Sequence, residues 1–114
     1  INGVRESLKF FNQGTSIALM IDQRVSEGEK INFFNNPAYT TTIPKQFAKK
    51  FRCKIQPVHI ERYDKIHFKI LFDEQIVVGE NTDEASISLK LNQWLEKKIK
   101  KNPTQWIWSH DRWK

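Results

Sequence analysis

Residues 59 to 64 read HIERYD, so that four residues separate His59 from Asp64. An imidazole held by a carboxylate is a common general base, and it takes a proton from a hydroxyl group when both side chains lie at one pocket. The pair would therefore support attack by a hydroxyl substrate, provided that the fold brings the two side chains together.

The local sequence pattern places the two side chains apart. Residues 55–60 and 66–72 alternate or run apolar on either side of the polar turn Tyr63-Asp64-Lys65, which predicts a β-hairpin. His59 then lies inside a strand, and Asp64 lies on the turn about 15 Å further along an extended chain. With 13 acidic residues among 114, this spacing is also common by chance. We predict an ordinary strand histidine at position 59 and no catalytic residue in the chain.

The remaining elements follow from periodicity and from turn residues. The expected order is a helix over residues 4–11 stopped by Gly14, a strand over 15–21 covered on both faces, a long loop over 25–41, a short helix from Thr42 to Phe51, the hairpin, and a helix capped by Thr82 that ends at Asn102-Pro103. This order predicts an α/β fold with a mixed β-sheet flanked by helices, in one domain over residues 1–114.

Composition limits the class of protein. The single Cys53 excludes an internal disulfide, and three scattered histidines give no zinc-site spacing. The net charge of +6 attracts nucleic acid, anionic lipid or acidic carrier proteins alike. The apolar run at residues 16–21 is too short to cross a bilayer, which takes about 20 residues. The chain begins at Ile1 without an initiator methionine, and we expect it to be a piece of a longer protein.

Three segments, in chain order, carry a resemblance. Asp22-Gln23, Gly28, Phe33-Phe34 and residues 37–41 follow the pattern D-Q-x4-G-x2-V-x-F-F-G-x-P-A-x-T. Pro57 with Glu61-Arg62 follows V-V-P...E-R, and residues 103–113 follow P-x-Q-W-x-W-x-H-R-R-W. Together these motifs resemble the late lipid A acyltransferases over nearly the whole chain. Asn35 stands where that family usually has glycine, Ile43 where small residues are common, and Asp111 replaces the first arginine of the terminal pair.

The resemblance implies an enzyme that moves a fatty acyl chain from acyl carrier protein to a hydroxyl group of a lipid A precursor. It implies work at the cytoplasmic face of the inner membrane of Gram-negative bacteria, on an anionic membrane surface, with no cofactor or metal. The fold expected is the C-terminal part of a glycerolipid-acyltransferase-like α/β fold. The family's His-x4-Asp/Glu dyad lies upstream of the segment that corresponds to residue 1. We therefore expect the catalytic half and its N-terminal anchor to be absent and the fragment to be inactive alone.

Seven residues are candidates for substrate binding. Asp22, Gln23 and Arg24 follow the predicted strand at its carboxyl end, where ligands collect in open α/β sheets. Arg24 could hold a phosphate while Asp22 or Gln23 orders the loop; the alternatives are a capping carboxylate and a solvated arginine. The other four candidates, each with a structural role as its alternative, are Phe34 (core anchoring), Arg62 (an ion pair with Glu61), His110 and Arg112.

Basic residues cluster at 45–54 and 97–101. They form either a solvated face or a contact for anionic lipid or the acidic carrier. A basic nucleic-acid module that stacks bases on its 14 aromatic residues is a rival interpretation. It is disfavoured because phenylalanines and tryptophans fall on predicted buried faces, so no nucleic acid partner is expected. A self-contained hydrolase or transferase that uses His59 and Asp64 is the third interpretation.

Overall fold

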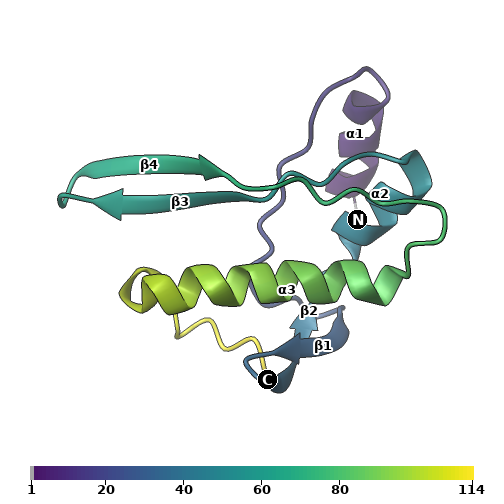
Figure 1. The fold of residues 1–114 in the computed structure, drawn as a ribbon. Helices are drawn as coiled ribbons and strands as arrows, with labels where there is room; N and C mark the ends of the chain where they lie inside the picture. Colours follow the sequence, from purple (N-terminus) through teal and green to yellow (C-terminus); the bar gives the residue numbers. More distant parts are fainter. Residues whose placement is uncertain (1) are drawn as a thin grey trace.

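The computed structural model describes residues 2–114 (Figure 1). Its elements, in chain order, are α1 (Asn2–Phe11), β1 (Glu29–Phe33), β2 (Asn36–Thr40), α2 (Ile43–Phe51), β3 (Val58–Tyr63), β4 (His67–Phe72), α3 (Glu84–Lys101) and the short 3₁₀ helix η1 (Pro103–Gln105). The strands pair as two separate antiparallel sheets, β1 with β2 and β3 with β4. The α/β class is confirmed, with its strands divided between two small sheets.

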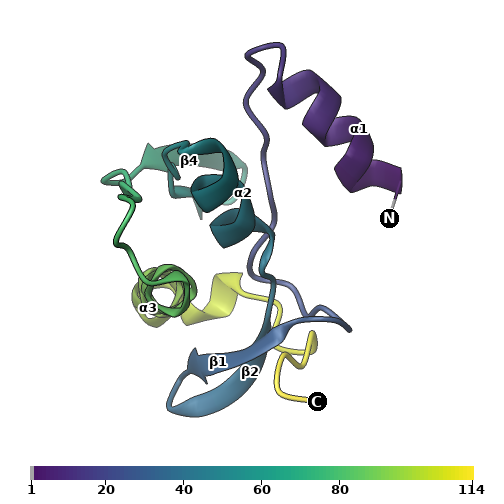
Figure 2. The same cartoon turned by 90° about the vertical axis from the view of Figure 1, so that its right-hand side faces the viewer.

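Helix α3 lies between the two sheets. Figure 2 looks along α3, with β1 and β2 on one side and α2 on the other. Its buried residues recur every three to four positions, which is the spacing of one helix face: Ile87, Ser88, Leu91, Asn92, Leu95 and Ile99. Asp83 caps the helix by accepting a hydrogen bond from the Ser86 N–H. The expectation of a Thr82 cap is wrong, because the Thr82 hydroxyl accepts from the Gly79 N–H at 2.9 Å instead.

The main core lies where α3, the β1–β2 sheet and the C-terminal tail meet. Phe33, Ala38, Leu95 and Ile99 form its buried centre. Phe34 and three tryptophans pack around this centre: Trp94, Trp106 and Trp113. The tail is therefore part of the folded body.

The predicted loop over residues 25–41 is wrong, because most of it forms the β1–β2 hairpin. Phe34 and Asn35 both have positive φ, at 51° and 60°, as a two-residue hairpin turn with strands of native twist requires. Asparagine tolerates this conformation better than most residues. Pro37 is accommodated in β2 because β2 pairs with a single neighbour, which leaves one edge free of ladder hydrogen bonds.

The predicted strand over residues 15–21 is also wrong. The segment has no ladder partner among residues 2–114, and Leu19 and Met20 are exposed. A strand needs neighbours to satisfy its backbone groups, and apolar sequence alone does not supply them. The segment runs past α2 and the base of the β3–β4 hairpin as irregular chain (Figure 1).

Helix α2 and the β3–β4 hairpin are confirmed. Pro44 stands in the first turn of α2, and Arg52 ends the helix in the left-handed conformation. The hairpin strands start at Val58, and Ile55 forms an isolated bridge with Ile76. No helix within residues 2–114 combines the length and the apolar character needed to cross a bilayer.

Candidate functional site

The histidine and the aspartate of HIERYD are not paired. His59 lies on β3 opposite Leu71, whereas Asp64 lies beyond the end of β3 and faces His67, with 3.6 Å between Nδ1 and Oδ2. Burial lowers the pKa of His59, and the positive charge of Lys98 lowers it further. The His59 Nε2 atom is buried without a hydrogen-bond partner. Residue 59 therefore lacks the carboxylate that would orient it as a base.

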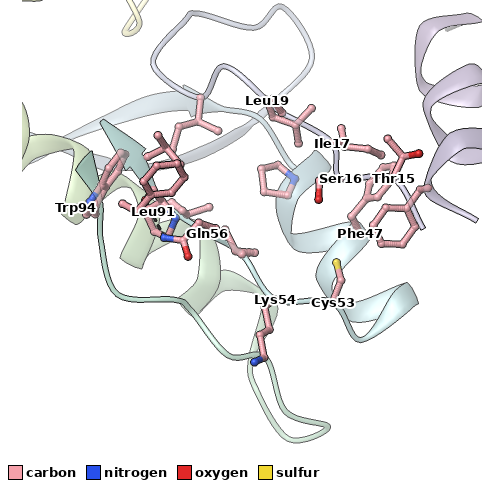
Figure 3. Close-up of a pocket in the computed structure, with 18 of the residues that line it drawn as sticks. Thr15, Ser16, Ile17, Leu19, Phe47, Cys53, Lys54, Gln56, Leu91 and Trp94 are labelled. Atoms are coloured by element: carbon pink, nitrogen blue, oxygen red, sulfur yellow. Dashed lines mark hydrogen bonds between the residues drawn. The ribbon is translucent and has the colours of Figure 1, made fainter. Parts of the chain in front are cut away.

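An apolar groove of about 680 Å³ opens beside α2 and α3 (Figure 3). Its walls come from residues 14–21, α2, residues 53–58 and α3. Figure 3 shows Leu19 and Ile17 along the irregular segment, with Leu91 and Trp94 reaching in from α3. A hollow of this size with apolar walls and few polar groups is typical of a small-molecule site. It suits an aliphatic ligand.

A second cavity of about 240 Å³ adjoins the groove and shares Leu19, Ile21, Val58 and Trp94 with it. Asp22 lies on its wall, together with His59 and Lys98. Asp22, which follows the irregular apolar segment, thus borders the cavity beside the groove, but the strand end on which its candidate role was based is absent from residues 2–114. Gln23 and Arg24 are exposed beside it.

Arg112 is fully buried at the centre of a polar network. Its Nη2 atom donates to the Thr40 hydroxyl at 3.2 Å and to the Asn92 side-chain oxygen at 3.3 Å. The Asn92 amide donates to the same hydroxyl and to the Asn32 carbonyl. Burial lowers the pKa of Arg112, and the negative charge of Asp22 opposes that shift. The expectation of substrate contact by Arg112 is corrected, because no part of this side chain reaches solvent.

The dipeptide Asp111-Arg112 lies close to the Asp22-Gln23-Arg24 segment. The Asp111 carboxylate accepts from the Trp113 N–H at 3.1 Å, and this bond is the main reason that the pKa of Asp111 is lowered. The positive charges of Lys114 and Arg24 lower it further. The negative charge of Asp22 thus favours the charged form of Arg112, and the positive charge of Arg24 favours that of Asp111, so residues 22–24 and 111–112 are linked electrostatically.

Three of the seven candidates lie elsewhere. Phe34 packs on Phe33 with ring centres 4.7 Å apart, and its N–H donates to Glu96, which corresponds to the core-anchoring alternative. Arg62 is exposed on β3, where its backbone exchanges two hydrogen bonds with the Gln105 side chain. His110 is exposed in a turn of the tail.

The expected ion pair between Glu61 and Arg62 is wrong. Successive strand residues point to opposite faces, which separates the two side chains. Glu61 instead accepts from the Asn102 amide and lies 3.5 Å from Lys101.

The expected basic faces are only partly free. Lys45 is buried and lies 2.6 Å from Glu29, while Lys98 lies 2.6 Å from Asp73. Lys49 donates to two backbone carbonyls ahead of α3. The lysines that stay exposed are Lys50, Lys54, Lys97, Lys100 and Lys101.

Sequence reasoning missed Asn92 and Thr40, the two partners of the Arg112 guanidinium. The available signal for Asn92 is a polar residue four positions after Ser88 that lies on the same helix face as the apolar Leu91 and Leu95. The tail tryptophans do not alternate on one face, because η1 and the following turns break the extended pattern. Trp106 packs on Phe33, whereas the Trp108 indole is half-exposed and donates to the Pro103 carbonyl.

Comparison with known proteins supplies the family. Residues 1–114 match the sequence profile of the family described as bacterial lipid A biosynthesis acyltransferase. No curated protein matches the chain. Because the profile match covers the whole chain, this protein belongs to the bacterial lipid A biosynthesis acyltransferase family.

Proposed function

We propose that this chain is the C-terminal portion of an enzyme that transfers a fatty acyl chain from acyl carrier protein to a hydroxyl group of a lipid A precursor. The observation that carries this proposal is the apolar groove with Asp22 at its adjoining end, in a member of an acyltransferase family. In this proposal the groove holds the acyl chain, and Asp22 borders the adjoining cavity, towards which the thioester is directed.

The reaction needs a base that this chain does not supply. The acceptor hydroxyl loses its proton to the base while its oxygen forms a bond to the thioester carbon. The tetrahedral oxyanion is stabilised by nearby donors, the carbon–sulfur bond then breaks, and the carrier thiolate is protonated. His59 has no orienting carboxylate, and the His67–Asp64 contact lies at the far end of the hairpin. We infer that the base comes from an upstream His-x4-Asp/Glu segment, so the 114-residue chain alone is inactive.

The exposed cations fit anionic partners. Arg24 is exposed two residues after Asp22 and can meet a phosphate of the lipid A precursor, and Gln23 between them is also exposed. Lys97, Lys100 and Lys101 are exposed at the end of α3 and suit an acidic carrier protein or anionic headgroups. From this assignment we infer that the enzyme works at the cytoplasmic face of the inner membrane.

The packing of three core aromatic residues disfavours the nucleic-acid interpretation. Base stacking needs accessible aromatic faces, whereas Phe33 is buried and Trp106 and Trp113 pack against it.

The test measures acyl transfer by the parent enzyme from carrier proteins loaded with chains of different length. Ile17→Trp fills the groove, and we expect it to lower kcat/KM for long chains at least tenfold while short chains are less affected. Val77→Trp is the control, because Val77 is exposed and does not line the groove. Equal transfer of all chain lengths by Ile17→Trp, or transfer by the 114-residue chain alone, would refute the proposal.

A further inference from the structure

The solvent side of α3 carries a row of lysines. Lys90, Lys97 and Lys101 are spaced seven and four residues apart, so they lie on one side of the helix. All three are exposed, and together they are called here the lysine row, which extends about 16 Å along the helix axis. Lys90 and Lys97 have no ion-pair partner among the side chains that the structure describes.

The dipole of α3 explains only part of this row. Cations are stabilised by the dipole in the last turn of a helix, which here holds Lys98, Lys100 and Lys101. Lys90 lies in the first half of α3, and Lys97 precedes the last turn. These two lysines therefore gain nothing comparable from the helix itself.

The carboxylates that lie against the row are already engaged. Glu96 is the one acid of α3 after its first residue, and it is mostly buried because it accepts from a backbone N–H of the β1–β2 turn. Asp73 lies 2.6 Å from Lys98, and Glu61 lies 3.5 Å from Lys101. The positive charge at positions 90 and 97 thus stays uncompensated and attracts an anionic partner.

The lysine row runs beside the apolar groove. Trp94 follows Lys90 by four positions and precedes Lys97 by three, so the three side chains are neighbours on the helix surface. Trp94 lines both the groove and the adjoining cavity, and Figure 3 shows it beside Leu91 at one end of the groove. A partner bound on the row is therefore next to the place proposed for the acyl chain.

The exposed side chains of α3 favour a protein partner over a bilayer. A helix that lies in a membrane interface buries an apolar face among the headgroups. No large apolar side chain of α3 is exposed, since its apolar residues face the core or the groove. An acidic protein needs no such face, because complementary charges are enough to guide and orient its docking.

We propose that the lysine row docks the acidic carrier protein that brings the acyl chain, with carboxylates of the carrier opposite Lys90 and Lys97. The acyl chain then enters the groove beside Trp94. The proposal rests on the proposed function for the use of a carrier-bound donor. It adds the surface that the carrier occupies and distinguishes that surface from the cations left for lipid headgroups.

The test measures transfer of one acyl chain by the parent enzyme from two donors. The first donor is the acyl carrier protein, and the second is the pantetheine thioester of the same chain, which keeps the thioester arm without the acidic protein. The variant combines Lys90→Glu with Lys97→Glu. The control combines Lys9→Glu with Lys65→Glu, two exposed lysines outside α3, and so changes the net charge equally.

We expect the α3 variant to lower kcat/KM for the carrier donor roughly tenfold or more, mainly through KM, and to leave the pantetheine donor unaffected. The control should keep the ratio of the two donors. Added salt should slow carrier-dependent transfer by the natural enzyme more than by the variant. An equal loss with both donors, an unchanged carrier reaction, or a loss that appears only with anionic vesicles would each overturn the proposal.

Direct binding separates this proposal from the proposed function. The fluorescence anisotropy of a labelled carrier protein gives its affinity for the parent enzyme and for the variant. A parent without acyl transfer whose carrier binding is weakened by the two substitutions counts against the function and leaves the docking surface standing. An active parent whose carrier binding is the same in the variant has the reverse meaning.

Discussion

The guanidinium carbon of Arg112 lies 4.3 Å from the centre of the Phe33 ring, so a positive charge is buried on an aromatic face. The charge is held by the ring, by Thr40 and Asn92 through Nη2, and by the more distant Asp22. Its Nε and Nη1 atoms are buried without a protein partner. Arg112 thus fills space in the core as much as it supplies polar bonds.

This dual role predicts different costs for two substitutions. Arg112→Met keeps most of the volume and removes the buried charge, whereas Arg112→Ala also leaves a cavity beside Phe33. We expect Arg112→Ala to be less stable than Arg112→Met by about 2 to 5 kcal/mol, the usual cost of deleting a large buried side chain. Urea unfolding at pH 7 measures the difference. Equal stability of the two variants would show that packing is unimportant here.

The turn at Phe34-Asn35 predicts the effect of restoring the family's glycine. Asn35 has φ of 60°, which glycine adopts freely and which costs other residues about 1 to 2 kcal/mol. We expect Asn35→Gly to be at least as stable as the natural chain and Asn35→Val to be clearly less stable. Thermal unfolding of the two variants tests this order, and a valine variant as stable as the glycine variant would contradict the turn assignment.

Gly28 and Gly3 form a matched pair of glycines. A Cβ atom at Gly28 would lie 2.7 Å from the Thr40 carbonyl oxygen, whereas one at Gly3 meets nothing within 4 Å. Gly28→Ala should therefore destabilise the fold by about 1 to 3 kcal/mol, because the contact is with backbone that cannot turn aside. Gly3→Ala in α1 should be neutral or stabilising by up to about 1 kcal/mol. Chemical denaturation of both variants measures the contrast, and equal effects would refute the close packing at Gly28.

His59 predicts a pH dependence of stability. Burial lowers its pKa in the folded chain below the unfolded value of about 6.5, so the unfolded state binds the proton first as pH falls. The free energy of unfolding should therefore decrease as pH drops from 7 towards 5, and His59→Leu should flatten that slope. His67→Leu, at an exposed position of the same hairpin, is the control. The attribution to His59 fails if the slope is as steep in His59→Leu as in the natural chain.

The opposite charges of Arg24 and Asp111 predict that a substitution at one position can restore stability lost by a substitution at the other. Asp111→Arg restores the family's arginine but removes the bond from the Trp113 N–H and places a positive charge near Arg24. We expect a lower unfolding temperature for Asp111→Arg and partial recovery when Arg24→Asp is added, measured as a double-mutant cycle. Strict additivity of the two changes would mean that the positions do not interact.

Local patterns in the sequence were enough for the helices α2 and α3 and for the β3–β4 hairpin. Each has a strong hydrophobic periodicity and clear residues that mark its ends, such as Pro44 in the first turn of α2 and Asn102-Pro103 after α3. The β1–β2 hairpin was missed because its turn uses Phe34 and Asn35 with positive φ, and Asn35-Asn36-Pro37 suggested irregular chain. The strand predicted at residues 15–21 failed because a strand depends on partners that no local pattern reveals.

The candidate site, too, could be predicted from the sequence only in part. The charges of Asp22 and Arg24 influence Arg112 and Asp111, respectively; the motif resemblance selected Asp22 and Arg112, whereas the predicted strand end selected Arg24. The contacts of Arg112 with Thr40 and Asn92 depend on how the tail folds back on α3, which is a long-range event. The burial of Arg112 could not be predicted either, because an arginine close in sequence to three tryptophans is compatible with a surface contact as well as with a core position.

The position of Trp113 against Phe33 has a consequence for synthesis on the ribosome. The two rings stack with centres 5.6 Å apart, although 80 residues separate them in the chain. Contacts between distant residues close late, because the intervening chain must be ordered first. The β1–β2 hairpin therefore stays without its aromatic cover until residues 112 and 113 have been synthesised and have cleared the exit tunnel. A nonsense mutation a few codons earlier would remove Trp113 and leave Phe33 without the ring that stacks on it. We expect cellular proteases to degrade such a truncated chain faster than the natural one.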